Sequence, residues 1–139
     1  MNYFTRVATP LFLALFLFSC ARKVMFVKSV VMPSANGQVK VKKDNNDNYN
    51  IRVSIRDLTE PENLTPPKKS YVVWSQTKKH GIVSLGQINT SRSIMARGFK
   101  ASLTSVSRYA PKRIFITAEE NSKVVEPGTT VVLTTEDFR

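Results

Sequence analysis

Residues 38–56 read QVKVKKDNNDNYNIRVSIR, and this stretch decides the fold. Polar and apolar residues alternate along 38–42 and again along 49–56, and the segment between them is rich in Asp and Asn. Successive side chains of a strand point to opposite faces of a sheet, so alternation predicts strands with one buried face and one wet face. Asp and Asn favour turns. The stretch therefore predicts a β-hairpin.

The two faces of this hairpin differ sharply in chemistry. The apolar face is expected to carry Val39, Val41, Tyr49, Ile51, Val53 and Ile55. The opposite face carries Lys40, Lys42, Arg52 and Arg56. A slip of one residue would bury the arginines, so we expect the pairing register to be well defined.

The rest of the chain continues the strand pattern. Apolar runs of strand-like length occur at 24–32, 71–74, 81–85, 93–103, 113–118 and 129–134, with Pro, Gly or Asn between them. Seven or eight short strands separated by frequent turns predict an all-β, antiparallel β-sandwich. We expect a single domain over 20–139. The stretch 91–100 is ambiguous, because its apolar residues fit either a strand or a helix.

The first residues predict an export signal. Residues 11–18 read LFLALFLF, which is too short a run for a transmembrane helix. The following Leu17-Phe18-Ser19-Cys20 resembles the bacterial lipobox, although Phe18 is unusual there. The resemblance implies cleavage after 1–19, a diacylglycerol on the Cys20 thiol and an acylated amine. The alternative is a plain secretory signal with an incidental cysteine.

The resemblance also implies a place in the bacterial cell envelope. Ala21 follows the cysteine, whereas the common Gram-negative signal for inner-membrane retention is an Asp at that position. The residues that follow contain no acidic run of the kind that some surface-exported lipoproteins carry. We therefore expect a lipid-anchored protein on the periplasmic face of the outer membrane.

Composition excludes several kinds of site. The chain has one Cys and one His, so a zinc site of Cys₂His₂ or Cys₄ type and an intrachain disulfide are both impossible. A Ser-His-Asp triad would depend on His80, which lies in a turn-like context. Glu119 and Glu120 are adjacent on a strand end, so they point to opposite faces and cannot act as a catalytic pair. Glu119 is instead a candidate to hydrogen-bond a neighbouring loop.

The segment 44–48 is a candidate calcium-binding loop, since its Asp and Asn spacing matches the first ligand positions of an EF-hand loop. The sixth position is Tyr49 where the loop needs Gly, and the twelfth is Ile55 where it needs Glu. We therefore expect a hairpin turn, and no metal, cofactor or catalytic residue in the chain. Trp74, within an apolar strand, is expected in the core rather than at a ligand platform.

Five short motifs resemble the extracytoplasmic C-terminal domain of anti-sigma-K-type factors. They are IRVSIRDL at 51–58, YVVW at 71–74, SLGQI at 84–88, IFITAEE at 114–120 and EPG at 126–128. The resemblance implies an immunoglobulin-like β-sandwich and a role in envelope sensing or regulation. The chain shows neither the cytoplasmic helical domain nor the transmembrane helix of those factors. We therefore expect the sandwich to be shared, but not direct inhibition of a sigma factor.

Positive charge is the remaining signal, with 21 Lys and Arg against 10 Asp and Glu. Lys40, Lys42, Arg52 and Arg56 are expected to form one contiguous patch. Other basic pairs lie at expected turns or beside the anchor, namely Arg22-Lys23, Lys68-Lys69, Lys78-Lys79 and Lys112-Arg113. The patch predicts contact with a polyanion, either anionic lipid or an acidic envelope protein; the alternative is a solvated face that favours solubility. Export and the lack of an aromatic-basic stacking motif argue against nucleic acid.

The expected function is thus a non-catalytic binding or structural module of the envelope. The alternative is a sensory or regulatory envelope component related to the outer domain of anti-sigma factors.

Overall fold

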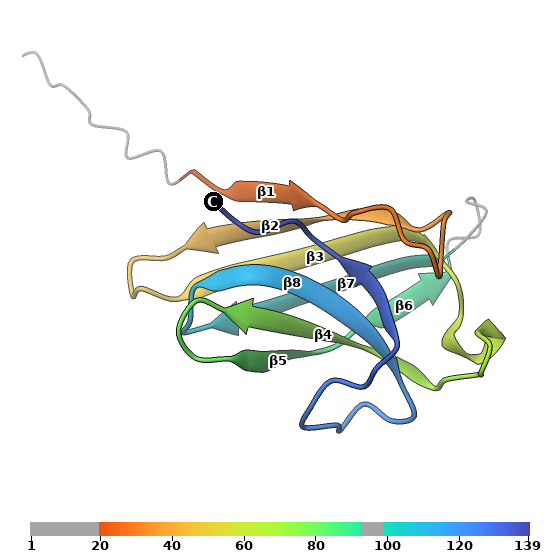
Figure 1. Cartoon of the computed structure of the whole chain (residues 1–139). Coiled ribbons are helices and arrows are strands. Elements are labelled where there is room, and N and C mark those ends of the chain that lie inside the picture. Colours follow the sequence, from red (N-terminus) through yellow and green to blue (C-terminus); the bar gives the residue numbers. More distant parts are fainter. Residues whose placement is uncertain (1–19, 93–98) are drawn as a thin grey trace, which may run out of the picture.

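The computed structural model describes residues 20–92 and 99–139, and it shows an antiparallel β-sandwich, as the sequence predicts (Figure 1). The predicted signal peptide at 1–19 and part of the ambiguous stretch, 93–98, lie outside the described residues. One sheet has the strand order β1-β2-β3-β7-β6, and the other has the order β5-β4-β8-β9. Apart from β1, this is the strand order of an immunoglobulin-type sandwich, with β4 in the place of strand C.

The five-stranded sheet contains the predicted hairpin. Its strands are β1 (Arg22–Met25), β2 (Asn36–Lys43), β3 (Tyr49–Leu58), β7 (Phe99–Ser107) and β6 (Asn89–Arg92). Val39 pairs with Val53, and Val41 pairs with Ile51, so the apolar faces of β2 and β3 coincide as expected. These four side chains are buried in the intersheet core.

The four-stranded sheet consists of β5 (Ile82–Gln87), β4 (Ser70–Thr77), β8 (Pro111–Glu119) and β9 (Val131–Thr134). Tyr71 and Val73 of β4, and Ile114 and Ile116 of β8, turn inward and complete the core. A short 3-10 helix, η1 (Pro61–Asn63), lies in the connection from β3 to β4. Within 20–92 and 99–139, no helix is long and apolar enough to cross a membrane.

Three local features of the structure differ from the predicted pattern. The apolar run at 24–32 is a strand only as far as Met25, because the following residues leave the ladder and cross toward β9, where the Val27 N–H bonds to the Thr134 carbonyl. Strand β6 was not among the predicted strands, because its sequence Asn-Thr-Ser-Arg has no apolar residue. Lys112 and Arg113 lie in β8, not in a turn, because Pro111 occupies the first position of that strand, where a missing N–H is tolerated.

Both described ends of the chain lie at the same end of the sandwich (Figure 1). Strand β1 begins there, and the Arg22 guanidinium donates a hydrogen bond to the Arg139 carbonyl oxygen. The β2–β3, β4–β5 and β7–β8 turns lie at that end too, because β2, β4 and β7 end where β3, β5 and β8 begin. We call it the Cys20 end.

Candidate functional site

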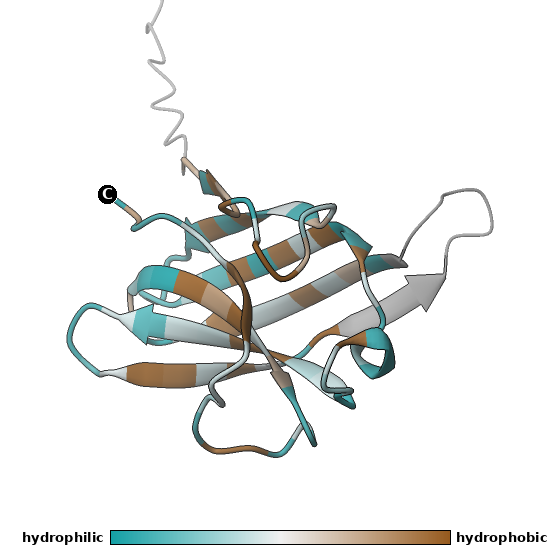
Figure 2. Ribbon diagram, turned by 45° about the vertical axis from the view of Figure 1, so that its right-hand side comes forward, coloured by the Kyte–Doolittle hydropathy of each residue, from teal (hydrophilic) through white to brown (hydrophobic). Residues whose placement is uncertain are grey.

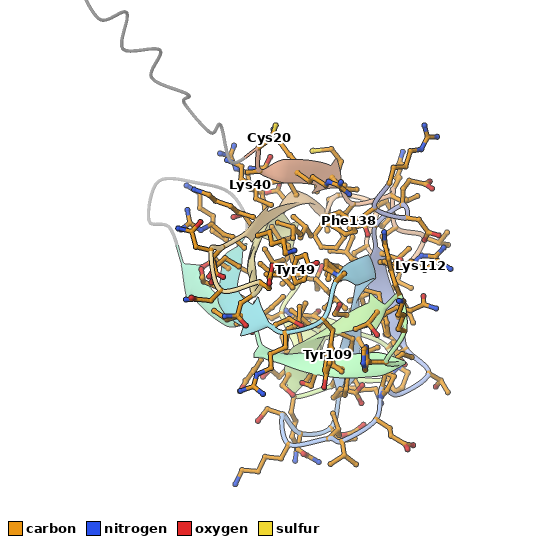
Figure 3. All side chains as sticks on the ribbon, turned by 90° about the vertical axis from the view of Figure 1, so that its left-hand side faces the viewer. Cys20, Lys40, Tyr49, Tyr109, Lys112 and Phe138 are labelled. Carbon is orange, nitrogen blue, oxygen red and sulfur yellow. The ribbon has the colours of Figure 1, made fainter. Side chains whose placement is uncertain are left out.

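Cys20, the predicted lipidation residue, is exposed and lies two residues before β1 (Figure 3). An extended chain advances at most about 3.6 Å per residue, so Cys20 lies within about 7 Å of the start of the sheet. A lipid on Cys20 would therefore hold this end of the sandwich directly at a bilayer surface.

The predicted basic face lies on the outer side of the five-stranded sheet. Lys40 pairs with Arg52 on one side and with Lys23 on the other, and Arg52 in turn pairs with Thr104. Neighbouring strands lie about 4.8 Å apart, so three cations form one row across the sheet. Lys42 stands two residues along β2 on the same face, opposite Asn50.

The positive charges of this row are not paired with acidic side chains within the described residues. Lys23, Lys40, Lys42 and Arg52 are all exposed, and none of them forms an ion pair within the described residues. Lys40, Lys42 and Arg52 line a shallow hollow of about 310 Å³, whose wall also includes Ala21. The hollow thus begins next to Cys20, and its lining contains no acidic side chain.

Arg56 does not belong to the same patch, so the prediction of one contiguous set of four cations was wrong in this respect. It pairs with Asn36 near the far end of β3, four residues from Arg52. A strand rises about 3.4 Å per residue, which separates the two arginines by roughly 14 Å along the strand. Arg56 lines a different hollow, together with Gln38 and Ser54.

Two further hollows lie at the Cys20 end, and the sequence did not predict them. The first, of about 380 Å³, is lined by residues that include Cys20, Arg22, Lys43, Tyr49, Lys78 and Phe138. The second, of about 350 Å³, shares Lys43, Tyr49 and Lys78 with it and adds Lys79, Arg108 and Tyr109. Figure 3 shows Cys20, Tyr49, Tyr109 and Phe138 on this end of the molecule. We call the combined feature the end hollows.

His80 lies in the wall of the second end hollow, in an exposed turn as expected. Its ring stacks on Tyr109, with 4.1 Å between centroids and 20° between planes. The turn is held by Thr77, whose hydroxyl accepts a hydrogen bond from the His80 N–H and donates one to the Gly81 carbonyl. Gly81 has a φ of +69°, a conformation that suits glycine.

Trp74 is buried, as predicted, but it does not face the other sheet. Tyr71 and Val73 belong to the intersheet core, and alternation along β4 turns Trp74 to the outer face of its sheet. Its indole N–H donates to the Thr117 hydroxyl oxygen at 2.8 Å, and that hydroxyl donates to Glu119 at 2.5 Å.

Glu119 completes this chain of hydrogen bonds. The carboxylate oxygen that receives the Thr117 hydroxyl also accepts the backbone N–H of Gly128 at 2.7 Å. Glu119 is buried, with 6 % of its surface exposed, so the expected hydrogen bond to a neighbouring loop is present. The YVVW, IFITAEE and EPG motifs thus meet in one buried polar cluster, which we call the Trp74–Glu119 cluster.

The acidic hairpin turn is organised by its own hydrogen bonds. One carboxylate oxygen of Asp44 accepts the backbone N–H groups of Asn46 and Asn48, at 2.8 and 3.0 Å. Because these bonds favour the charged form, they hold the pKa of Asp44 below its ordinary value. In the part of the chain that the structure describes, no three His, Cys, Asp or Glu side chains are grouped as a metal site would require.

An apolar segment is exposed beside the edge of the four-stranded sheet. Val30 is 95 % exposed, Val31 is half exposed, and Val27 and Val131 are 41 % and 44 % exposed. The Ser29 hydroxyl ties this segment to β9 through the Val132 carbonyl at 2.6 Å. Figure 2 shows hydrophobic residues on this connection between β1 and β2. We call it the valine edge.

No protein-family model, curated protein or solved structure matches the chain.

Proposed function

We propose that this chain is a lipid-anchored, non-catalytic binding module of the bacterial envelope, on the periplasmic face of the outer membrane. Its outer sheet face would dock an acidic partner. The observation that carries the proposal is the row of Lys23, Lys40 and Arg52 on three adjacent strands, with no acidic side chain in the adjoining hollow.

Such a row has an energetic cost in the isolated domain. Two like charges about 5 Å apart in water repel by roughly 0.8 kcal/mol, and directly opposed like charges destabilise a sheet. A carboxylate- or phosphate-rich partner would remove this repulsion and replace it with attraction. Lys42 and the hollow beside it extend the same surface.

The position of the anchor favours an envelope protein as the partner for this face. Cys20 lies at one end of the sheet, and β2 and β3 extend from there to the opposite end of the sandwich (Figure 1). A domain tethered there presents its sheet face to the side, where it can meet a neighbouring protein. Charge complementarity would then set the encounter rate and the specificity of the contact.

The test is site-specific photo-crosslinking in intact cells, with the crosslinker replacing Thr104, the exposed residue opposite Arg52. We expect a defined adduct that disappears when Lys40→Glu and Arg52→Glu are introduced together. The matched control is Lys123→Glu, an exposed lysine in the distant β8–β9 loop, which should leave the adduct unchanged. An adduct that is insensitive to the two sheet-face changes, or no adduct at all, contradicts the proposal.

A second candidate function is a sensory or regulatory envelope component, related to the outer domain of anti-sigma factors. The valine edge supports it, because contiguous exposed apolar side chains mark protein–protein contact sites. A crosslinker at Val30 should then capture a protein with a transmembrane helix and a cytoplasmic part, and the adduct should be lost in Val31→Asp. Adducts with abundant envelope proteins only, unchanged by Val31→Asp, would contradict this candidate.

A further inference from the structure

We propose that the end hollows are a docking surface for anionic phospholipid headgroups, so that the Cys20 end of the sandwich lies flat on the membrane that holds the anchor. This inference concerns a surface other than the sheet face. It rests on the proposed function only in taking Cys20 as the point of attachment.

The first argument is the length of the tether. Cys20 lines the first end hollow, and β1 begins two residues later. No linker of useful length separates a lipid on Cys20 from the folded domain, which leaves little freedom of orientation. The surface around Cys20 is therefore the surface that an anchored domain brings to the headgroups.

The second argument is charge. Lys78, Lys79 and Arg108 line the end hollows and are exposed, and none of them forms an ion pair within 20–92 and 99–139. The acidic side chain in the lining is Asp47, which forms an ion pair with Lys43 at 2.8 Å. The hollows are thus strongly cationic, and basic residues close to an anionic leaflet are attracted to it.

The third argument is the kind of side chain between the cations. Tyr49, Tyr109 and His80 line the second hollow, with His80 stacked on Tyr109. Aromatic side chains with a polar group are favoured at membrane–water interfaces, because one part is apolar and the other remains hydrated. The cations of this concave surface can contact the phosphodiester headgroup of a lipid, and the aromatic rings can contact the first carbons of its acyl chains.

The opposite end of the sandwich has a different charge pattern. Glu62, Glu120 and Glu126 are exposed in the connections at that end, and Glu120 forms an ion pair with Lys68 at 2.8 Å. Because Lys69 and Lys123 are also exposed there, this end has a mixed charge and would be attracted to an anionic leaflet less than the end hollows are. The charge distribution therefore favours the same orientation as the tether does.

The experiment uses the mature domain, residues 20–139, with Cys20→Ser, since all the described strands lie between Arg22 and Thr134. Cosedimentation is measured at about 0.1 M salt, where the Debye length is about 10 Å, with phosphatidylcholine vesicles that contain or lack phosphatidylglycerol. We expect binding only to the vesicles with phosphatidylglycerol. The triple variant Lys78→Gln, Lys79→Gln, Arg108→Gln should lower the partition constant about 100-fold, from about fivefold for each cation near the surface.

The matched control removes the same number of charges from the outer face of the five-stranded sheet, farther from Cys20, with Lys40→Gln, Arg52→Gln and Arg56→Gln. It should retain binding within about threefold of the unmodified domain, because the cations nearest the bilayer dominate within a Debye length. Circular dichroism melting curves check that both variants remain folded.

The possible outcomes separate this inference from the proposed function. Absence of binding to phosphatidylglycerol vesicles overturns the inference, and so does an equal loss in the two triple variants. A larger loss in the sheet-face variant also overturns it, since the membrane contact would then lie on that face. None of these outcomes changes the result of the Thr104 crosslinking in cells, which tests the acidic partner of the sheet face.

Discussion

Replacement of Thr117 by Val tests whether the Trp74–Glu119 cluster stabilises the fold. Val has nearly the shape of Thr and lacks the hydroxyl. That hydroxyl accepts the Trp74 N–H at 2.8 Å and donates to Glu119 at 2.5 Å, and all three residues are buried. The substitution therefore removes two hydrogen bonds without opening a large cavity.

The expected cost follows from the groups that are left unpaired. A buried donor without its acceptor costs about 1–3 kcal/mol, and a bond to a charged group contributes about 1.5–3 kcal/mol. Glu119 keeps the Gly128 N–H, and the new methyl group gains some apolar burial, so the combined loss in the free energy of unfolding is about 2–4 kcal/mol. For a domain of this size, that lowers the Tm by roughly 10 °C.

The measurement is urea unfolding followed by far-UV circular dichroism, analysed as a two-state transition. Thr104→Val is the matched control, since Thr104 is an exposed threonine on β7 and should change stability by less than about 0.5 kcal/mol. In a double-mutant cycle with Trp74→Phe, we expect a coupling energy of about 1–2 kcal/mol. A Thr117→Val protein as stable as the wild type, or strictly additive effects in the cycle, would refute the role of the cluster.

Three other predictions concern alkaline stability, strand packing and the anchor. Burial raises the pKa of the Tyr71 phenol in the folded state, so above the unfolded-state value of about 10 only the unfolded chain loses this proton. The free energy of unfolding should then fall by about 1.4 kcal/mol more per pH unit in the wild type than in Tyr71→Phe, as measured by urea unfolding between pH 10 and 12; parallel pH profiles would contradict this. Gly37→Ala should cost about 2 kcal/mol or more in the same urea assay, because its Cβ would meet the Ser54 carbonyl oxygen and come within 2.9 Å of the Ile55 Cα; an unchanged midpoint would rule out this clash. Cys20→Ala should abolish palmitate labelling and membrane fractionation, and retention of that variant in membranes after a carbonate wash would exclude the lipid anchor.

The local pattern of the chain was enough to predict the class of fold. Alternation with period two is a property of neighbouring residues, so it revealed the hairpin of β2 and β3 and the shared outer face of Lys40, Lys42 and Arg52. The lipobox-like segment before Cys20 is equally local. The sequence pattern did not predict the polar strand β6, because it is a strand only through its pairing with β7.

The grouping of residues from distant segments required the tertiary structure. The β4–β5 turn brings Lys78 and Lys79 to the end where the β7–β8 turn places Arg108, and this proximity depends on which strands pair across two sheets. Alternation showed that Trp74 lies on one face of its strand, but not whether that face meets the other sheet.

For this protein, the sequence by itself determined an antiparallel sandwich, a candidate anchor at Cys20 and an outer face rich in cations, because each depends on the order of adjacent residues. The tertiary structure alone decided that Arg56 stands apart, that Trp74 bonds to Thr117 on the outer side of its sheet, and that a second basic surface lies around Cys20. The physical reason is that these contacts join residues far apart in the chain. Their meeting is set by strand order and by the pairing of strands that are distant in the chain, which no local pattern encodes.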